Sequence, residues 1–470
     1  MVIIVSQETK GNNKMDIKKT TPPLVTGLIS TALCFSLGFF NNVFTYNGLE
    51  FFYAYIAFSI LLCYPMNLVA IYLEKTYPQI NTHSKLVKLL TGSSKLRTLS
   101  ILFTGVTIII LAIIILNITS YSLDFVDNIH AIDRLTNASL NFDSYTPIYI
   151  TLALVLIAMV ILLLLAHKDK ICLNIITKTL AHSSLYLIVI LSLMVLYIPH
   201  GISGIKDFIF DLNYQTQSQV KNMLGMAMIY AILSNFISLA LNKNIISVAD
   251  NSLSKIKVSA VKSILYNVVL SLILCLAIFT ILGEYRTYLQ PEQSVKISTI
   301  FSIIKHNSAM CYAILEVIFI TFNLVIFITA LKYICAISTK LHIRVTLLLI
   351  AFIIAISFFA NNFTDIDFNQ LFGIHLVIIY LFMLDVFLVG WVYDAQKMSY
   401  DIIKNTGTKL SPLFNIILRI VIPFVCIIVT IGYIFPAISL AWQILAALIC
   451  IVIYIIKGTI FHNILNKRKI

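Results

Sequence analysis

The sequence predicts an all-α membrane protein of about twelve transmembrane helices, and three observations support this fold class. First, 60% of the 470 residues are hydrophobic and only 11% are charged, whereas a soluble domain carries roughly 25% charged residues. Second, the mean hydropathy of +0.96 comes from long apolar runs with short polar segments between them. Third, successive polar segments alternate between many and few lysine and arginine residues. Lipid is therefore the expected solvent of most of the chain.

Twelve apolar runs are long enough to cross a membrane, because a spanning helix needs about 20 mostly apolar residues to satisfy its backbone without water. They lie near 24–44, 51–74, 99–122, 147–166, 184–199, 222–247, 258–283, 308–338, 341–360, 371–396, 412–435 and 438–458. The last two lie close together, and no soluble domain interrupts the series. We therefore expect one transmembrane domain over 23–458, with tails over 1–22 and 459–470.

The distribution of basic residues predicts the orientation of these spans, because cytoplasmic loops are enriched in lysine and arginine. If the N-terminus is cytoplasmic, the segments predicted inside hold 22 Lys and Arg residues and those outside hold six. The inside segments are 1–22, 75–98, 167–183, 248–257, 339–344, 397–411 and 459–470. Residues 1–22 show no signal peptide, and Met15 is a second candidate start. The prediction is a multi-pass protein of a bacterial inner membrane with both termini cytoplasmic.

The sequence lacks the motifs of several function classes. There is no GxxxxGK[ST], no HExxH, no Gly-rich dinucleotide fingerprint and no CxxC among the eight cysteines. The net charge of +13 is explained by topology and anionic lipid rather than by nucleic acid. We therefore expect no enzyme activity, no organic cofactor and no nucleic-acid partner. The expected partners are the lipid bilayer and a small-molecule substrate, while the oligomeric state is left open.

Polar groups within predicted spans are candidate functional residues, since burying them in lipid is costly. Glu316 and Asp385 are the two acidic ones, and either could carry protons. Amide and hydroxyl groups interrupt other spans, and they either bond neighbouring helices or bind substrate. These are Asn41, Asn42, Ser234, Asn235, Asn267 and Asn323. Lys332 and Arg419 are expected to extend to the cytoplasmic headgroups.

Two spans contain sequences typical of a broken helix. Span 1 holds CFSLGFFNNVF, with Gly38 among small and polar residues, and span 6 holds AILSNF. Breaks at corresponding places in two halves of a transporter mark a substrate site at the middle of the membrane. Spans 1 and 6 correspond if the first ten spans form two five-helix repeats.

Several stretches resemble the neurotransmitter:sodium symporter family. Span 10 into span 11 reads LFGIHLVIIYLFMLDVFLVGWVYDAQKMSYDIIKNTGTKLSPLFNIILRIVIPFV, and span 7 reads SILYNVVLSLILCLAIFTILG. The segments YNGLEFFYAYIAFSILLCYPMNLVAIYLEK and VLYIPHGISGIKDFIFDL also follow the family pattern in order and spacing. The resemblance runs from about residue 24 to 458. It implies a leucine-transporter-like fold with inverted repeats near 24–199 and 222–396, broken helices 1 and 6, and two extra helices near 412–458.

The resemblance also implies functional positions. The implied substrate positions are Ser36, Leu37, Gly38, Ile115, Ile229, Tyr230, Ile232, Ser234 and Asn235, with Ala330 beside them. The implied sodium positions are Ala32, Cys34, Phe35, Asn267, Phe322, Val325 and Ile326. The implied outer gate pairs Asn42 with Gln370, where the family has an Arg–Asp pair.

This chain departs from the family at its ion sites. The family's Asn in span 1 and hydroxyl in span 6 appear here as Phe39 and Tyr230, and its two span 8 hydroxyls as Val325 and Ile326. Thr321 or Thr329 would restore a hydroxyl if the alignment shifts.

Three functions stay open from the sequence. The first is secondary active transport of a small amino acid or amine, with family-type sodium symport through a partly degenerate ion site. Its variant is proton-coupled or exchange transport through Glu316 or Asp385. The second is a transporter-like protein that no longer moves substrate, such as a receptor or complex subunit. The third is a membrane-embedded transferase, for which His130, His200 and His306 lack a recognisable partner spacing.

Overall fold

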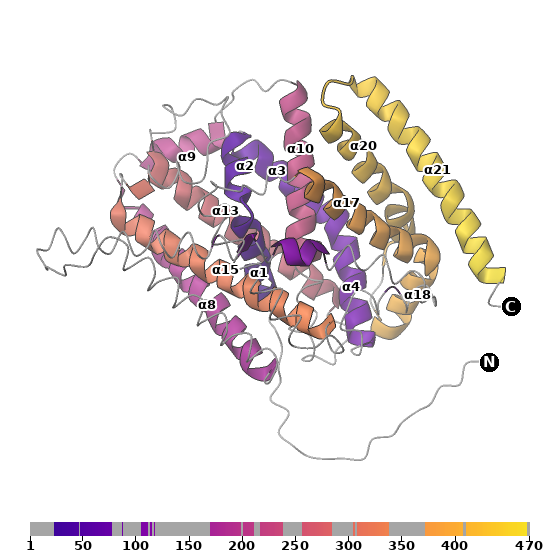
Figure 1. Ribbon diagram of the computed structural model, residues 1–470, viewed down its shortest axis with the longest axis horizontal. Helices are drawn as coiled ribbons and strands as arrows, with labels where there is room; N and C mark the ends of the chain where they lie inside the picture. Colours follow the sequence, from indigo (N-terminus) through magenta and orange to yellow (C-terminus); the bar gives the residue numbers. More distant parts are fainter. Residues whose placement is uncertain are drawn as a thin grey trace, which may run out of the picture.

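The computed structural model shows a bundle of helices in which the first helix of the chain is largely buried (Figure 1). The described residues form helices joined by turns. They are 23–46, 48–77, 87, 105–110, 113–114, 117, 170–198, 201–210, 217–237, 256–283, 304–305, 308–337, 372–407 and 410–467.

The first half of the bundle contains three membrane-length units within the described residues. Helix α1 (Pro23–Ser36) and helix α2 (Phe39–Thr45) together form a bent pair, and α3 (Leu49–Phe58), η1 (Ser59–Cys63) and α4 (Tyr64–Thr76) form one rod with a π-helical turn. Helix α8 (Lys170–Val195) is the third, and the short α9 (Gly201–Phe210) follows it.

Four further membrane-length helices follow in the second half of the described bundle before the C-terminal segments. They are α10 (Gln217–Ala231) with the π-helical turn η3 (Ile232–Ile237), α13 (Ile256–Leu282), α15 (Ala309–Ile337), and α17 (Phe372–Phe387) with η7 (Leu388–Val392). The chain ends with α18 (Ala395–Thr406), then α19 (Leu413–Ile416), η8 (Ile417–Val421) and α20 (Ile422–Ile434), and finally α21 (Leu440–Lys467).

Eight helices among the described residues are long and apolar enough to cross a membrane, and the bent pair α1–α2 would make nine. All nine overlap spans that the sequence predicts, so the all-α membrane class is confirmed. The spans predicted near 147–166 and 341–360 lie outside the described residues, and the one near 99–122 is described only in part. The count of twelve therefore stays a prediction.

One predicted boundary is wrong. The fifth span was expected at 184–199 after a loop, but α8 is helical from Lys170 and its membrane-length part is Asn174–Val195. The polar residues of this stretch suggested a loop, yet Thr177 is buried within the bundle. At the C-terminus, the membrane-length part of α21, Leu440–Ile460, agrees with the predicted span 438–458, and the helix continues into the predicted tail as far as Lys467.

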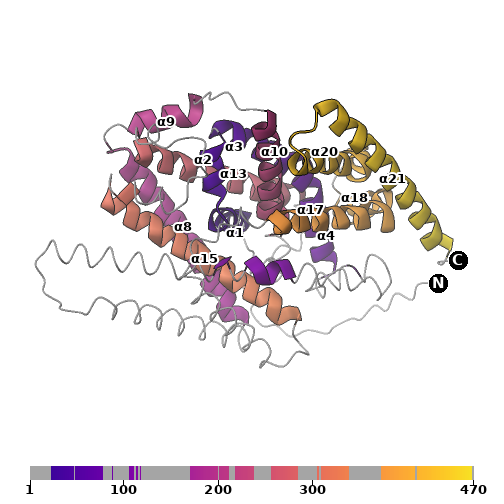
Figure 2. The same ribbon diagram turned by 45° about the horizontal axis from the view of Figure 1, so that its top comes forward.

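Helix α1 occupies the centre because it packs on several sides at once. It contacts α13, α15, α8 and η3, and 12 of its 14 residues are buried. Helices α8 and α15 lie side by side in both views, and α21 lies at the edge of the bundle beside α20 (Figures 1 and 2). The large exposed side chains of α21 agree with a lipid-facing position.

An ion pair fixes the amphipathic helix α18 to the bundle. Asp394, with a φ of 83°, caps α18 by accepting from the Gln396 amide at 2.8 Å. The guanidinium of Arg419 donates to the same carboxylate at 2.5 Å and to the Gly390 carbonyl at 3.0 Å. It also lies 5.1 Å from the centre of the Trp391 ring. Arg419 therefore binds within the protein instead of only extending to headgroups.

The contact between α9 and α13 depends on a glycine. A Cβ atom added at Gly204 would lie 1.9 Å from the carbonyl oxygen of Phe279, whereas one added at Gly373 would have no neighbour within 4 Å. We expect Gly204→Ala to force α9 away from α13 at a cost of roughly 1–3 kcal/mol. Thermal unfolding of the two alanine variants in detergent checks this. Equal melting temperatures for Gly204→Ala and Gly373→Ala would contradict the packing described here.

Candidate functional site

The site begins at a break in the first transmembrane helix. Helix α1 ends at Ser36 and α2 begins at Phe39, with a bend of 64° between the two. Gly38 has a φ of 87°, a left-handed conformation in which a side chain other than Asn is strained. The amides of Leu37 and Gly38 bond the carbonyls of Cys34 and Phe35, both at 3.2 Å, and thereby close the last turn of α1. The carbonyls of Ser36, Leu37 and Gly38 lie beyond this turn, and that of Gly38 also accepts from the Asn41 amide of α2 at 3.1 Å.

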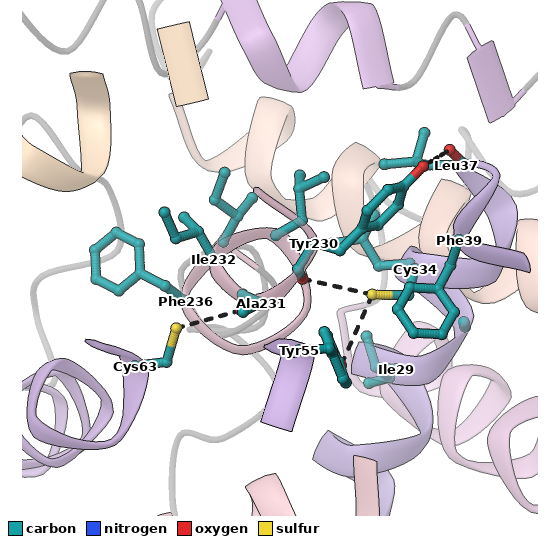
Figure 3. Close-up of a cluster of buried hydrophobic side chains, with 14 of the residues drawn as sticks. Ile29, Cys34, Leu37, Phe39, Tyr55, Cys63, Tyr230, Ala231, Ile232 and Phe236 are labelled. Atoms are coloured by element: carbon teal, nitrogen blue, oxygen red, sulfur yellow. Dashed lines mark hydrogen bonds between the residues drawn. The ribbon is translucent and has the colours of Figure 1, made fainter. Parts of the chain in front are cut away.

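Side-chain donors converge on these three carbonyls. The Tyr230 hydroxyl of α10 donates to the Leu37 carbonyl at 2.7 Å (Figure 3). The Asn117 amide donates to the Ser36 carbonyl at 2.6 Å, and the Asn42 amide donates to the Gly38 carbonyl at 3.2 Å. Carbonyls outside regular helix are tolerated at membrane depth only when protein or water satisfies them. Here two of the three donors come from other parts of the bundle.

An aromatic ring fills the space beside the break. Phe39 is fully buried, and its ring centre lies 4.9 Å from that of Tyr55 and 5.4 Å from those of Phe35 and Tyr230. Figure 3 shows Phe39 and Cys34 side by side, with Tyr230 and Tyr55 around them. The wall of the site next to the three carbonyls is therefore aromatic and apolar.

A second polar cluster is organised by Asn267 of α13. Its amide nitrogen donates to the Tyr55 hydroxyl at 2.7 Å and to Oδ1 of Asn235 at 3.2 Å. Its Oδ1 accepts from the Thr31 hydroxyl at 3.1 Å. The Tyr55 hydroxyl in turn donates to the Ser234 hydroxyl at 2.9 Å. The network thus joins α1, α3, η3 and α13 in the bundle core.

The π-helical turns η1 and η3 extend this network. The Asn235 amide donates to the Ser59 hydroxyl at 3.1 Å, and the Cys63 thiol donates to the Ala231 carbonyl at 3.3 Å (Figure 3). A π-helical turn leaves its carbonyls out of the regular α-helical ladder, and such turns are frequent at functional sites. The two turns contact each other, and η3 also contacts α1 and α13.

The network already uses two of the groups at the positions that the resemblance relates to sodium, namely the Asn267 side chain and the Tyr230 carbonyl. A sodium site needs several oxygen acceptors that point at one empty position, because hard cations take oxygen ligands. Here the amide nitrogen of Asn267 donates to oxygens of Tyr55 and Asn235. The Cys34 thiol donates to the Tyr230 carbonyl at 3.6 Å. Ala32 and Phe35 are buried beside Cys34 on α1. As built, these groups stabilise helix packing.

The span 8 positions offer no side-chain oxygen either. Val325 and Ile326 are buried hydrocarbon side chains on α15, and the Phe322 ring lies 6.4 Å from that of Phe35. The hydroxyls of Thr321 and Thr329, which a shifted alignment would use, donate to the carbonyls of their own helix at 2.7 and 2.8 Å.

The remaining predicted positions divide into three groups. Ile229, Ile232 and Ala330 are fully buried. Ile115 and Gln370 lie outside the described residues, so the Asn42–Gln370 gate is not observed, and the Asn42 amide instead donates to the Tyr230 hydroxyl at 3.2 Å. Glu316 of α15 and Asp385 of α17 are both buried. No group of three His, Cys, Asp or Glu that could hold a metal occurs within the described part of the chain.

Sequence reasoning missed three polar residues that the fold brings to these clusters. Asn117 lies two residues beyond the predicted Ile115 position, so a short shift of the span 3 alignment would have found it. Tyr55 stands within an aromatic run, and Thr31 within an apolar helix, where neither pattern gives a signal. The chain matches no protein-family model and no curated protein, so its function is argued from this geometry.

Proposed function

We propose that the protein is a secondary active transporter that moves a small amino acid or related amine across the membrane by alternating access. The observation that carries this proposal is the buried break between α1 and α2, where the carbonyls of Ser36 and Leu37 accept from donors elsewhere in the bundle. Discontinuous helices inside a membrane bundle are a typical way to build a substrate site. The contact between α1 and the π-helical turn η3 supports a role for spans 1 and 6 together.

The chemistry of the break suits both ends of an amino acid. An ammonium group carries three donors, which match the carbonyls of Ser36, Leu37 and Gly38. To bind there, it must displace the side-chain donors that now occupy these carbonyls, namely the Asn117 amide, the Tyr230 hydroxyl and the Asn42 amide. The displaced amides and hydroxyl then become available to donate to the substrate carboxylate. The Phe39 ring beside them favours an apolar side chain.

The family resemblance supplies the rest of the proposal. Two inverted repeats near 24–199 and 222–396, cytoplasmic termini and an inner-membrane location would follow from it. Sodium symport is its family-type coupling mode, but sodium would have to break the Asn267 network before it found enough oxygens. Proton coupling or exchange is therefore the mode that this chain favours within the same function.

Counterflow in proteoliposomes tests transport without assuming a coupling ion. Vesicles are loaded with unlabelled leucine, phenylalanine, glutamate or an aliphatic amine, and uptake of the same labelled solute is followed without any ion gradient. We expect exchange of an apolar amino acid or amine and none of glutamate. If no solute is exchanged, the transport proposal fails, and a receptor or complex subunit becomes the better interpretation.

Tyrosine variants show whether the exchanged solute uses the break. Tyr230→Phe removes the hydroxyl that competes for the Leu37 carbonyl. We expect roughly a fivefold change in the half-saturation concentration of counterflow, because one hydrogen bond contributes about 1 kcal/mol. Tyr186→Phe is the matched control, because Tyr186 is 67% exposed on α8. If both variants behave as the wild type, the solute binds elsewhere.

A further inference from the structure

The contact between α8 and α15 contains a buried lysine. Lys332 lies five residues before the end of α15, and its side chain is only 7% exposed. Its Nζ donates to Oδ1 of Asn174 and to the hydroxyl of Thr177, both at 2.9 Å. The expectation that Lys332 extends to the headgroups is therefore wrong, because neutral oxygens one turn apart on α8 hold its amine inside the bundle.

No carboxylate balances this charge among the described residues. The two side chains that Lys332 bonds are an amide and a hydroxyl, and no acidic residue occurs on α8. Lys178, one turn beyond Asn174 on α8, is a second positive charge in the neighbourhood. Helix α1, also packed against α15, carries no charged residue, and its titratable side chain is Cys34. Tyr333 is the titratable neighbour on α15 itself.

The two oxygens accommodate both protonation states of the amine. As an ammonium, Nζ donates to both of them. After it releases one proton (R–NH₃⁺ to R–NH₂ and H⁺), it still donates to Asn174 and can accept from the Thr177 hydroxyl, which is both donor and acceptor. The bonds of the charged form are stronger, since a hydrogen bond with an ionised partner is about twice as strong as a neutral one.

We propose that Lys332 is a proton-binding site that clamps α15 to α8 when charged and loosens the pair when neutral. Ionisable side chains inside a membrane bundle are rare and mark ion pathways and proton relays. Coupling of this proton to solute movement rests on the transport function proposed above, whereas proton binding itself does not.

The position of Lys332 connects the clamp to the centre of the bundle. Val325 precedes it by seven residues, so the two lie on the same face of α15, about 10 Å apart along the axis. Helix α15 also packs against α1, where Phe319 and Phe322 contact the Phe35 ring just before the break. A change at the α8–α15 contact is therefore transmitted along one rigid helix to the break.

Hydrogen–deuterium exchange of the full-length protein in nanodiscs tests proton binding directly. Exchange rates, corrected for the intrinsic effect of pH, are followed from pH 5.5 to 9.5 in peptides from the start of α8 and the end of α15. Helix ends open locally, so their exchange reports the clamp. We expect protection to fall about tenfold through a single midpoint as pH rises, the loss expected for one charge-assisted bond.

Variants assign the midpoint to one residue. Lys332→Met should exchange fast at every pH, and Lys332→Arg, which keeps its charge, should show no midpoint. Lys262→Met, an exposed lysine of α13, is the matched control and should titrate as the wild type does. A flat wild-type profile, or the same midpoint in Lys332→Met, would overturn the proposal. A titrating clamp in a protein that shows no counterflow would instead remove the transport function and keep the proton site.

Discussion

Replacing Asn267 by leucine is expected to destabilise the protein more than any other single change discussed here. The side chain is fully buried and bonds Tyr55, Asn235 and Thr31, which come from three other helical segments. Leucine leaves these partners without their bonds in a site that excludes water, at roughly 1–3 kcal/mol for each group that finds no other partner. We expect a total loss of about 4 kcal/mol and a large drop in melting temperature in detergent.

Asn323 provides a matched control for this prediction. It is also a fully buried asparagine in a long apolar helix, but its amide donates only to the Phe319 carbonyl of its own helix, at 2.8 Å. Its Oδ1 has no hydrogen-bond partner among the described residues. Asn323→Leu should therefore be much milder than Asn267→Leu. Equal melting temperatures for the two variants would show that the Asn267 network contributes no more to stability than the single hydrogen bond of Asn323.

Gly38→Val is expected to abolish transport while leaving most of the bundle folded. The left-handed φ of 87° costs roughly 1–2 kcal/mol for an ordinary L residue, and a β-branched side chain is worse. The conformational strain is relieved most easily by a change of backbone conformation at the break. This change moves the carbonyls of Leu37 and Gly38 away from their donors. We expect at least about a tenfold loss of counterflow rate, since a displacement of a binding group by 1 Å can lower a rate by this factor.

Asparagine separates backbone geometry from side-chain bulk at this position. Asn tolerates the left-handed region better than any other residue with a side chain, so Gly38→Asn should keep more activity than Gly38→Val. Size-exclusion profiles and melting temperatures of both variants show whether each is folded. If Gly38→Val is folded and exchanges solute at the wild-type rate, the break is not the substrate site.

The sequence predicts the helices well because lipid imposes a length and an apolar composition on each of them. Every membrane-length helix of the described residues overlaps a predicted span, and the break at Gly38 coincides with small and polar residues. The start of α8 was missed because a span was expected to be apolar throughout, and this part of α8 is polar. Its polar residues face the interior, where they receive Lys332, so their polarity suggested a loop.

The partners of polar residues were harder to predict than the helices. Asn267 was recognised as a candidate, but its bonds to Thr31 and Tyr55 join segments more than 200 positions away, and no local pattern records them. The aromatic packing of Phe39 is a tertiary effect of the same kind. Because Lys332 lies near the end of a span, its side chain was predicted to extend to the lipid headgroups. The oxygens that bind it instead come from another helix, α8.

Gradient-driven uptake into proteoliposomes tests whether the protein is a proton-coupled transporter of apolar amino acids or amines. A labelled mixture of apolar amino acids and amines is offered with an inward proton gradient, an inward sodium gradient or neither, to the wild type and to Lys332→Arg. We expect saturable accumulation with the proton gradient, little without it, and loss of the gradient's effect in Lys332→Arg. Absence of uptake by a folded wild-type protein under all three conditions would contradict proton-coupled transport.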